Sequence, residues 1–256
     1  MKKLLRGLAG LVGFLLFWEV VVQVGLVDKT FTPPPSVVLG TVADLLGDPE
    51  FIRDIVATML AWLIAIVVAI AIGVPAGLLL GSVPALRTAT AAIVEFLRPI
   101  PITALVPLVL LVIGSGPEAK ITLAVYASLW PIMFNTIYGM GEIDPVLMET
   151  ARACGTSRFR ILTSVALPQT APFVFTGVRL SATISLIAVV SVEFLAGSQL
   201  GLGSFIIVAS TGSVRFDLVL AGTVVAGTLG YLINEGLEQL GKRLFRWSTV
   251  DREAIA

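Results

Sequence analysis

The chain has 256 residues, of which 57% are hydrophobic and 13% are charged, and its formal net charge is zero. Soluble domains are about 25% charged, so this composition indicates an integral membrane protein. The balanced charge gives no basic surface for nucleic acid. A sequence without histidine and with one cysteine excludes an internal disulfide and a His/Cys metal site.

Long apolar segments predict an all-α, polytopic membrane protein. Residues 55–86 and 121–141 contain no charged side chain. Each stretch exceeds the roughly 20 helical residues that cross a hydrocarbon core of about 30 Å. Pro99 and Pro101 are expected to interrupt the third span. We predict about six transmembrane helices, over residues 7–27, 55–81, 87–113, 119–141, 170–197 and 217–241.

Two shorter segments between the spans also favour helix. Ser36 follows a run of prolines and is expected to cap a short amphipathic helix. Residues 204–209 are apolar but too short to span, and either a re-entrant or interfacial helix or an ordinary packed loop fits them. The apolar face of the short helix after Ser36 is expected to hold Val38, Val42, Leu45 and Leu46.

The distribution of lysine and arginine predicts that both termini are cytoplasmic, because cytoplasmic loops are enriched in these residues. With the N-terminus inside, the outer side holds four basic residues: Lys29, Arg53, Lys120 and Arg215. The inner side holds eleven: Lys2, Lys3, Arg6, Arg87, Arg152, Arg158, Arg160, Lys242, Arg243, Arg246 and Arg252.

A polar stretch between the fourth and fifth spans, residues 142–169, then faces the cytoplasm. Ala151 and Ala153 favour helix, and Gly155 permits the positive φ of a helix end. Thr156 or Ser157 can cap a following helix. Pro168 suits the first turn of the next span. These residues therefore predict a compact helical turn, and its arginines offer charge to a partner.

The stretch from Glu149 to Gly155, followed after nine residues by 165–168, resembles the EAA loop of bacterial ABC importer permeases, E-A-A-x3-G-x9-I-x-L-P. The chain departs from that pattern at Thr150 and Val165. The resemblance implies a coupling helix that docks into an ATPase subunit. The residues expected to couple are Glu149, Ala151, Arg152, Gly155, Thr156, Ser157, Arg158, Leu167 and Pro168.

Further segments resemble the permeases for nitrate, taurine and alkanesulfonates. They are residues 96–101, 104–107 and 114–116 with Lys120, and residues 193–197 and 201–203. Over residues 35–245 the resemblance implies a type I ABC importer permease fold. Implied partners are a second permease chain, identical or different, two ATPase subunits and an extracytoplasmic substrate-binding protein. Residues 1–34 are expected to form an N-terminal transmembrane helix and external link, and residues 35–256 the transport domain.

Charged side chains within spans are costly and mark candidate functional sites. Glu19 and Glu95 are interpreted as structural, and Glu95 can pair with Arg98 on one helix face. For Arg98, Arg179 and Glu193 the alternative is also a structural role, in which charges on neighbouring helices neutralise one another. The candidate translocation-path residues are Arg98, Pro99, Pro101, Arg179 and Glu193.

The expected function is the permease subunit of an ATP-driven importer in the bacterial inner membrane, carrying a small solute. The positive charges of Arg98 and Arg179 favour an anionic solute such as nitrate or a sulfonate. An uncharged heterocycle is the alternative solute if acidic side chains neutralise these two arginines. No phosphate-binding loop or catalytic cluster is evident, so ATP and magnesium are expected on the partner ATPase and no cofactor on this chain. A stand-alone secondary carrier or an intramembrane enzyme is the alternative.

Overall fold

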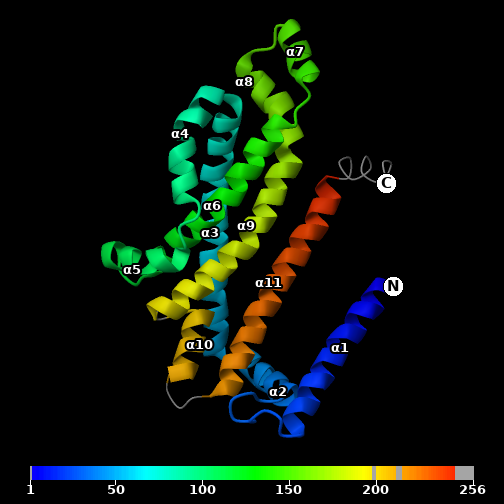
Figure 1. Ribbon diagram of the computed structural model, residues 1–256, viewed down its shortest axis with the longest axis vertical. Helices are drawn as coiled ribbons and strands as arrows, with labels where there is room; N and C mark the ends of the chain where they lie inside the picture. Colours follow the sequence, from blue (N-terminus) through cyan, green and yellow to red (C-terminus); the bar gives the residue numbers. More distant parts are fainter. Residues whose placement is uncertain (1, 198–199, 212–214, 246–256) are drawn as a thin grey trace. The chain divides into compact units, whose positions relative to one another are not determined.

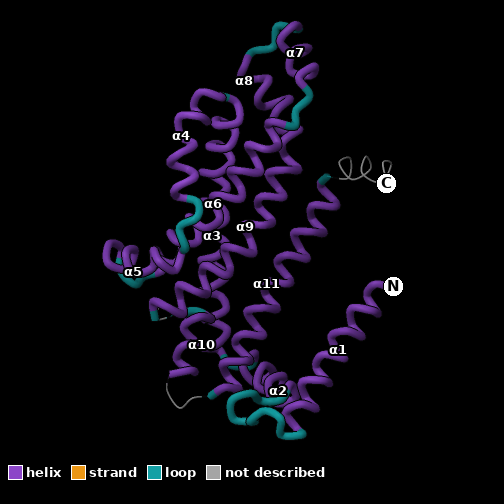
Figure 2. The backbone as a smooth tube through the Cα atoms, viewed as in Figure 1, coloured by secondary structure: helices purple, strands orange, loops and turns teal. Residues whose placement is uncertain are grey.

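A computed structural model describes residues 2–197, 200–211 and 215–245, all helical or in turns and loops, without a strand (Figure 2). The helices appear in Figure 1. In chain order they are α1 (Lys2–Gln23), α2 (Pro35–Leu46), α3 (Pro49–Ser82), α4 (Pro84–Leu97), α5 (Ile102–Ile113), α6 (Pro117–Gly141), α7 (Pro145–Ala153), α8 (Arg158–Ile161), the π-helix η1 (Leu162–Ala166), α9 (Leu167–Ala196), α10 (Leu202–Thr211) and α11 (Phe216–Leu244).

The all-helical membrane fold is confirmed. Four of the expected spans lie in helices long and apolar enough to cross a membrane: α3, α6, the continuous helix Phe159–Ala196 and α11. The third expected span is α4 and α5, which meet at 90° (Figure 1). Most of the first expected span lies in α1, whose stretch Ala9–Gln23 is apolar. Arg246 and Arg252, used above for orientation, lie outside the described residues.

The chain folds as two compact units. The first comprises Met1–Thr58 and Glu193–Leu229, and the second comprises Met59–Val192 and Gly230–Ala256. The core of the first unit gathers side chains from α2, α3, α10 and α11. In it the rings of Phe51 and Phe205 meet edge to face at 4.7 Å. The buried members of this core are Leu45, Phe51, Leu202, Ala221 and Val225.

The first unit corrects two details of the sequence interpretation. Ser36 does not cap α2; Pro34 holds that position, and the Ser36 amide and hydroxyl both donate to the Glu19 carboxylate, at 3.1 and 3.0 Å. Glu19 thus satisfies donors in the first turn of α2, which helix ends otherwise leave open. Leu46 is 52% exposed, whereas Val38 and Leu45 are buried. The run 204–209 is confirmed as helical within α10.

In the second unit, α6 packs closely against α3 and α9. Gly73, Gly77 and Gly81 are spaced four residues apart on α3. A Cβ at Gly77 would lie 2.5 Å from Thr136 Cβ on α6, so the two helices meet without a side chain between them. Such stripes of small residues let helix backbones approach closely inside a membrane, where packing rather than hydrophobicity drives association.

Polar groups also join the helices of this unit. The Trp62 indole N–H on α3 donates to the Ala182 carbonyl on α9 at 2.8 Å, and the Ser181 hydroxyl donates to the Ser128 carbonyl on α6 at 2.6 Å. Alanines from α3 and α6 fill the core between them, with Ala188 and Val189 from α9. These contacts hold the middle of α9 against α6 and α3.

Candidate functional site

The residues of the predicted coupling loop form one compact helical corner. α7 begins at Pro145 and is capped by Asp144, whose carboxylate accepts the Val146 amide at 2.8 Å. Proline at the first helical position costs no hydrogen bond, because that amide has no partner within a helix. Both Ala151 and Ala153 lie inside α7 as expected, and α7 ends at Ala153.

α7 ends in a Schellman motif centred on Gly155. The Gly155 amide donates to the Arg152 carbonyl at 2.9 Å, and the Thr156 amide donates to the Ala151 carbonyl at 3.1 Å. Gly155 has φ +73°, the left-handed conformation that this motif requires at its central residue. A Cβ there would have no atom within 4 Å. Glycine is therefore needed for its backbone conformation and not for space.

Ser157 opens the next helix. Its hydroxyl oxygen accepts the Arg160 amide at 3.4 Å, and its carbonyl accepts the Ile161 amide at 2.9 Å. Of the two residues considered as caps, Thr156 and Ser157, the hydrogen bonds select Ser157. Arg158 is the first residue of α8. Gly155 and Ser157 therefore end one helix and start another within four residues.

From α8 the helix runs without a break through η1 into α9, so the fifth predicted span begins earlier than residue 170. The Leu167 amide donates to the Leu162 carbonyl, which is the wider π spacing. A proline ring lacks an N–H and clashes with the carbonyl four residues earlier in a regular α-helix, here that of Ser164. The wide turn of η1 admits Pro168, which lies in the first turn of α9 as expected, within a continuous helix.

The corner presents a surface with both apolar and charged side chains. Val146 is 65% exposed and Phe159 is 76% exposed. Glu149, Arg152 and Arg160 are exposed beside them. Exposed apolar groups rimmed by charge are typical of a protein interaction surface. α7 lies at one end of the second unit in Figure 1.

Arg98 lies at the break between α4 and α5. Its guanidinium carbon stands 4.6 Å from the centre of the Phe134 ring on α6, a cation–π contact. Within the described residues Arg98 forms no ion pair with Glu95, so the pairing expected from their spacing is wrong. Pro99 follows the last turn of α4, and Pro101 caps α5. The Tyr126 hydroxyl donates to the Leu97 carbonyl and thereby satisfies an acceptor at the broken end.

Arg179 is neutralised by α11 and not by its neighbours on α9. Its guanidinium donates to Glu238 at 2.6 Å and to Asn234 at 3.0 Å. Lys242 also donates to Glu238 at 2.6 Å. The Arg179 side chain is 37% exposed, so this network is only partly shielded from solvent. Glu238 was not singled out from sequence, although its spacing of four from Lys242 and from Asn234 predicts a shared helix face.

Glu193, near the end of α9, is fully buried in the first unit. Its carboxylate accepts the Thr58 hydroxyl at 2.9 Å and the Gly203 amide at 3.1 Å. The same Thr58 oxygen accepts the Leu202 amide at 2.9 Å, and Asp54 accepts the Gly201 amide at 2.7 Å. The polar groups of α3 and α9 thus satisfy the first amides of α10. A role for Glu193 along a translocation path stays a prediction.

Comparison with known proteins identifies the family of this chain. Residues 69–244 match the family described as binding-protein-dependent transport system inner membrane component. The chain is 28% identical over 238 residues to the taurine transport system permease protein TauC of Escherichia coli (strain K12), covering 91% of this chain and 86% of that protein. It is 26% identical over 244 residues to the bicarbonate transport system permease protein CmpB of Synechocystis, with the same coverage.

Solved structures show the same fold. A chain of the MetNI methionine ABC transporter, in an inward-facing conformation, superposes with a TM-score of 0.67 and 20% identity, covering 76% of this chain and 95% of that one. A chain of a bacterial ABC transporter involved in alginate import superposes with a TM-score of 0.66 and 17% identity, covering 95% of this chain and 96% of that one.

Proposed function

Because this chain belongs to the family of binding-protein-dependent transport system inner membrane components, we propose that residues 142–169 form the cytoplasmic coupling loop of an ATP-driven importer. The chain is a permease subunit of an ABC importer in the inner membrane, and ATP hydrolysis takes place on a separate subunit. The family match does not favour a stand-alone carrier or an enzyme. Both termini then lie in the cytoplasm, as the basic residues predict.

One observation supports the coupling role above the others: α7 is joined to a membrane helix through a short turn that backbone and side-chain hydrogen bonds hold. The Schellman motif at Gly155 and the Ser157 cap fix the angle between α7 and α8. The helix then continues from Phe159 to Ala196. A force on α7 would reach α9 as a rigid-body movement, because the Schellman motif and the Ser157 cap hold the four residues between α7 and α8. ATP-driven closure of the ATPase subunits would thereby switch the access of the pathway.

The partners follow from the same proposal. Two ATPase subunits bind the cytoplasmic corners and hold ATP with magnesium, and this chain binds no cofactor itself. A second permease chain completes the pathway, and an external binding protein delivers the solute. One similar solved structure is an alginate transporter in complex with a periplasmic protein that holds an alginate pentasaccharide, which is consistent with that arrangement.

The proposed solute is a small anion. Relatives of this chain are named for taurine, bicarbonate and aliphatic sulfonates. Arg98 is exposed and stands over Phe134, and among the residues that the structure describes it forms no ion pair, so its charge is available to an anion. Arg179 is already paired with Glu238. Of the two arginines, Arg98 is therefore the better candidate for the pathway, and Arg179 the better candidate for joining α9 to α11.

The native Cys154 allows a direct test, because it is the only cysteine in the sequence and is exposed at the end of α7. The permease is co-expressed with its ATPase subunit, and Cys154 is labelled with a photoactivated maleimide cross-linker. We expect a covalent product with the ATPase subunit. The control is C154S/S115C, in which the cysteine lies in the exposed loop between α5 and α6. No product from Cys154, or an equal product from position 115, would overturn the coupling assignment.

A further inference from the structure

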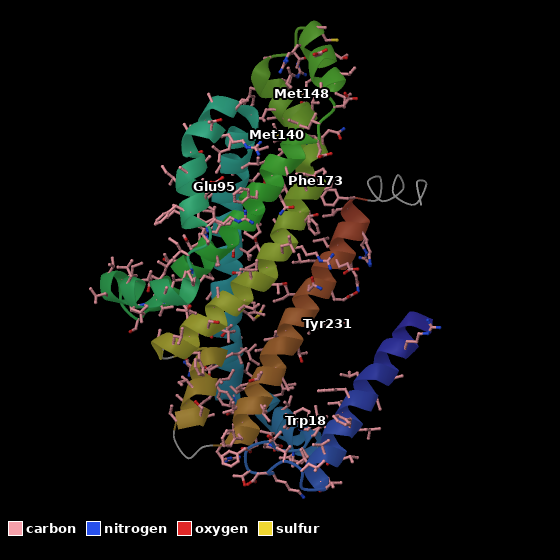
Figure 3. The ribbon with its side chains drawn as sticks, in the orientation of Figure 1. Trp18, Glu95, Met140, Met148, Phe173 and Tyr231 are labelled. Atoms are coloured by element: carbon pink, nitrogen blue, oxygen red, sulfur yellow. The ribbon has the colours of Figure 1, made fainter. Side chains whose placement is uncertain are left out.

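A cavity of about 970 Å³ lies behind α7. Its walls come from the last residues of α3, the end of α6, the inner face of α7 and the α8–η1 segment. Gly81 and Ser82 end α3, and Met140 is next to last in α6. Since both helices are candidate spans, the cavity lies at the level where they leave the apolar layer. Met140 and Met148 mark this region in Figure 3.

The lining is amphipathic and basic. Met140, Met148 and Leu162 form apolar walls of the cavity, and Ser82 and Thr156 contribute hydroxyl groups to its lining. Among the lining side chains that the structure describes, Arg152 is the charged one. Binding sites for small molecules are about 300–1,000 Å³ in volume, mostly apolar, with a few placed polar groups. The cavity fits that description, and its single positive charge selects an anionic ligand.

Only part of α7 lines the cavity. Met148 and Arg152 are one helical turn apart and both line it. Val146 and Glu149 do not line it and are exposed. Arg152 is exposed as well, and Glu149 precedes it by three residues on the same helix face. The side chains of Val146 and Glu149 are therefore open to an ATPase subunit, while Arg152 lines the cavity.

We propose that this cavity binds an anionic phospholipid, with the phosphate on the Arg152 guanidinium and one acyl chain against Met140, Met148 and Leu162. Basic pockets between membrane helices on the cytoplasmic side suit anionic headgroups, and a guanidinium pairs with phosphate through two parallel hydrogen bonds. The bound lipid would support α7 from behind. The proposal rests on the proposed orientation, which places the cavity at the anionic cytoplasmic leaflet.

The test uses the assembled importer in nanodiscs of phosphatidylcholine with phosphatidylglycerol, followed by native mass spectrometry of retained lipid. The variants are R152Q and R152K, and R160Q is the matched control because Arg160 is exposed and outside the lining. We expect R152Q to retain phosphatidylglycerol about tenfold less tightly, as the loss of a charge-assisted hydrogen bond predicts. R152K should lose less, and R160Q should match the wild type. The L162W variant, which narrows the cavity beside Arg152, should also weaken lipid retention.

Equal retention by R152Q and the wild type would overturn the proposal, as would equal retention of phosphatidylcholine. Release of the ATPase subunit from R152Q, with phosphatidylglycerol still bound, would show that Arg152 is a partner contact and would also overturn it. If the wild-type permease does not bind an ATPase subunit at all, the coupling function fails instead. Lipid retention by the permease alone still decides whether the cavity binds lipid.

Discussion

The Glu193 carboxylate occupies the volume that a side chain at residue 201 would need. A Cβ on Gly201 would lie 2.2 Å from both Cδ and Oε1 of Glu193, and Gly201 has φ +143°. Both residues lie in segments that resemble the nitrate, taurine and alkanesulfonate permeases, but the resemblance alone gives no physical reason for either residue. The structure supplies the reason: the loop before α10 passes so close to the buried carboxylate that only glycine fits, and the carboxylate binds the Gly203 amide.

We expect G201A to destabilise the permease strongly. The added methyl group overlaps the Glu193 carboxylate, and overpacking of this kind costs about 1–3 kcal/mol in addition to the backbone strain. Thermal unfolding followed by fluorescence-detected size-exclusion chromatography measures the loss. The matched control is G197A: φ is +58° there, but no atom lies within 4 Å of the new Cβ. A G201A protein as stable as G197A would refute the close approach.

Thr58 gives an independent test of the same cluster. T58V removes the hydroxyl group that donates to Glu193 and accepts the Leu202 amide, and leaves both buried groups short of a partner. Each buried group left unsatisfied costs about 1–3 kcal/mol. T58S keeps the hydroxyl and should retain most of the stability. Equal melting temperatures for T58V and T58S would show that the hydrogen bonds add little.

The glycine stripe on α3 predicts a steep dependence on side-chain size. G77A places a methyl group 2.5 Å from Thr136 Cβ and 2.8 Å from the Met133 carbonyl, so α3 and α6 must separate. We expect lower expression and a lower melting temperature. G40A in α2, where no atom lies within 4 Å of the new Cβ, should change neither. If G77A behaves like G40A, the α3–α6 packing is wrong.

The sequence predicted the membrane helices well because apolar runs and prolines act locally. The break at Pro99 and the positive φ at Gly155 also follow from single residues. The contact partners of the charged side chains within the membrane helices were not predictable in this way. Arg98 contacts Phe134 and Arg179 contacts Glu238, at separations of 36 and 59 residues, and only packing decides such pairs. The spacing of Gly73, Gly77 and Gly81 was a visible signal for close packing that the span analysis did not use.

The two arginines should respond differently to loss of charge. R98Q is expected to lower uptake of an anionic solute about tenfold or more, because a positive lining raises the local anion concentration, whereas R98K should retain most uptake. R179Q should reduce thermal stability and leave solute preference unchanged. The measurement is uptake by the reconstituted importer at low and high salt. Full uptake by R98Q would remove Arg98 from the pathway.

The membrane orientation predicts which cysteines react from outside the cell. An impermeant maleimide should label C154S/S115C in intact cells. The native Cys154 should react only after the membrane is opened. The opposite pattern would place the α7 corner outside the cytoplasm, and the inference from lysine and arginine would be wrong.

The turn at Gly155 is proposed to transmit movement from α7 to α9, and a series of substitutions at Gly155 tests this role. Because a Cβ at Gly155 would have no atom within 4 Å, only the backbone φ of +73° at this residue opposes substitution. Asparagine adopts this conformation most readily after glycine, alanine pays about 1–2 kcal/mol and valine more.

The measurement is ATP-driven uptake, by proteoliposomes that contain the whole importer, of the ligand that co-purifies with its binding protein. ATPase subunits bound per permease are counted in parallel. We expect uptake to fall in the order glycine, asparagine, alanine, valine, with uptake by G155V abolished while the permease remains in the membrane. Normal uptake by G155V would contradict the coupling role of residues 142–169.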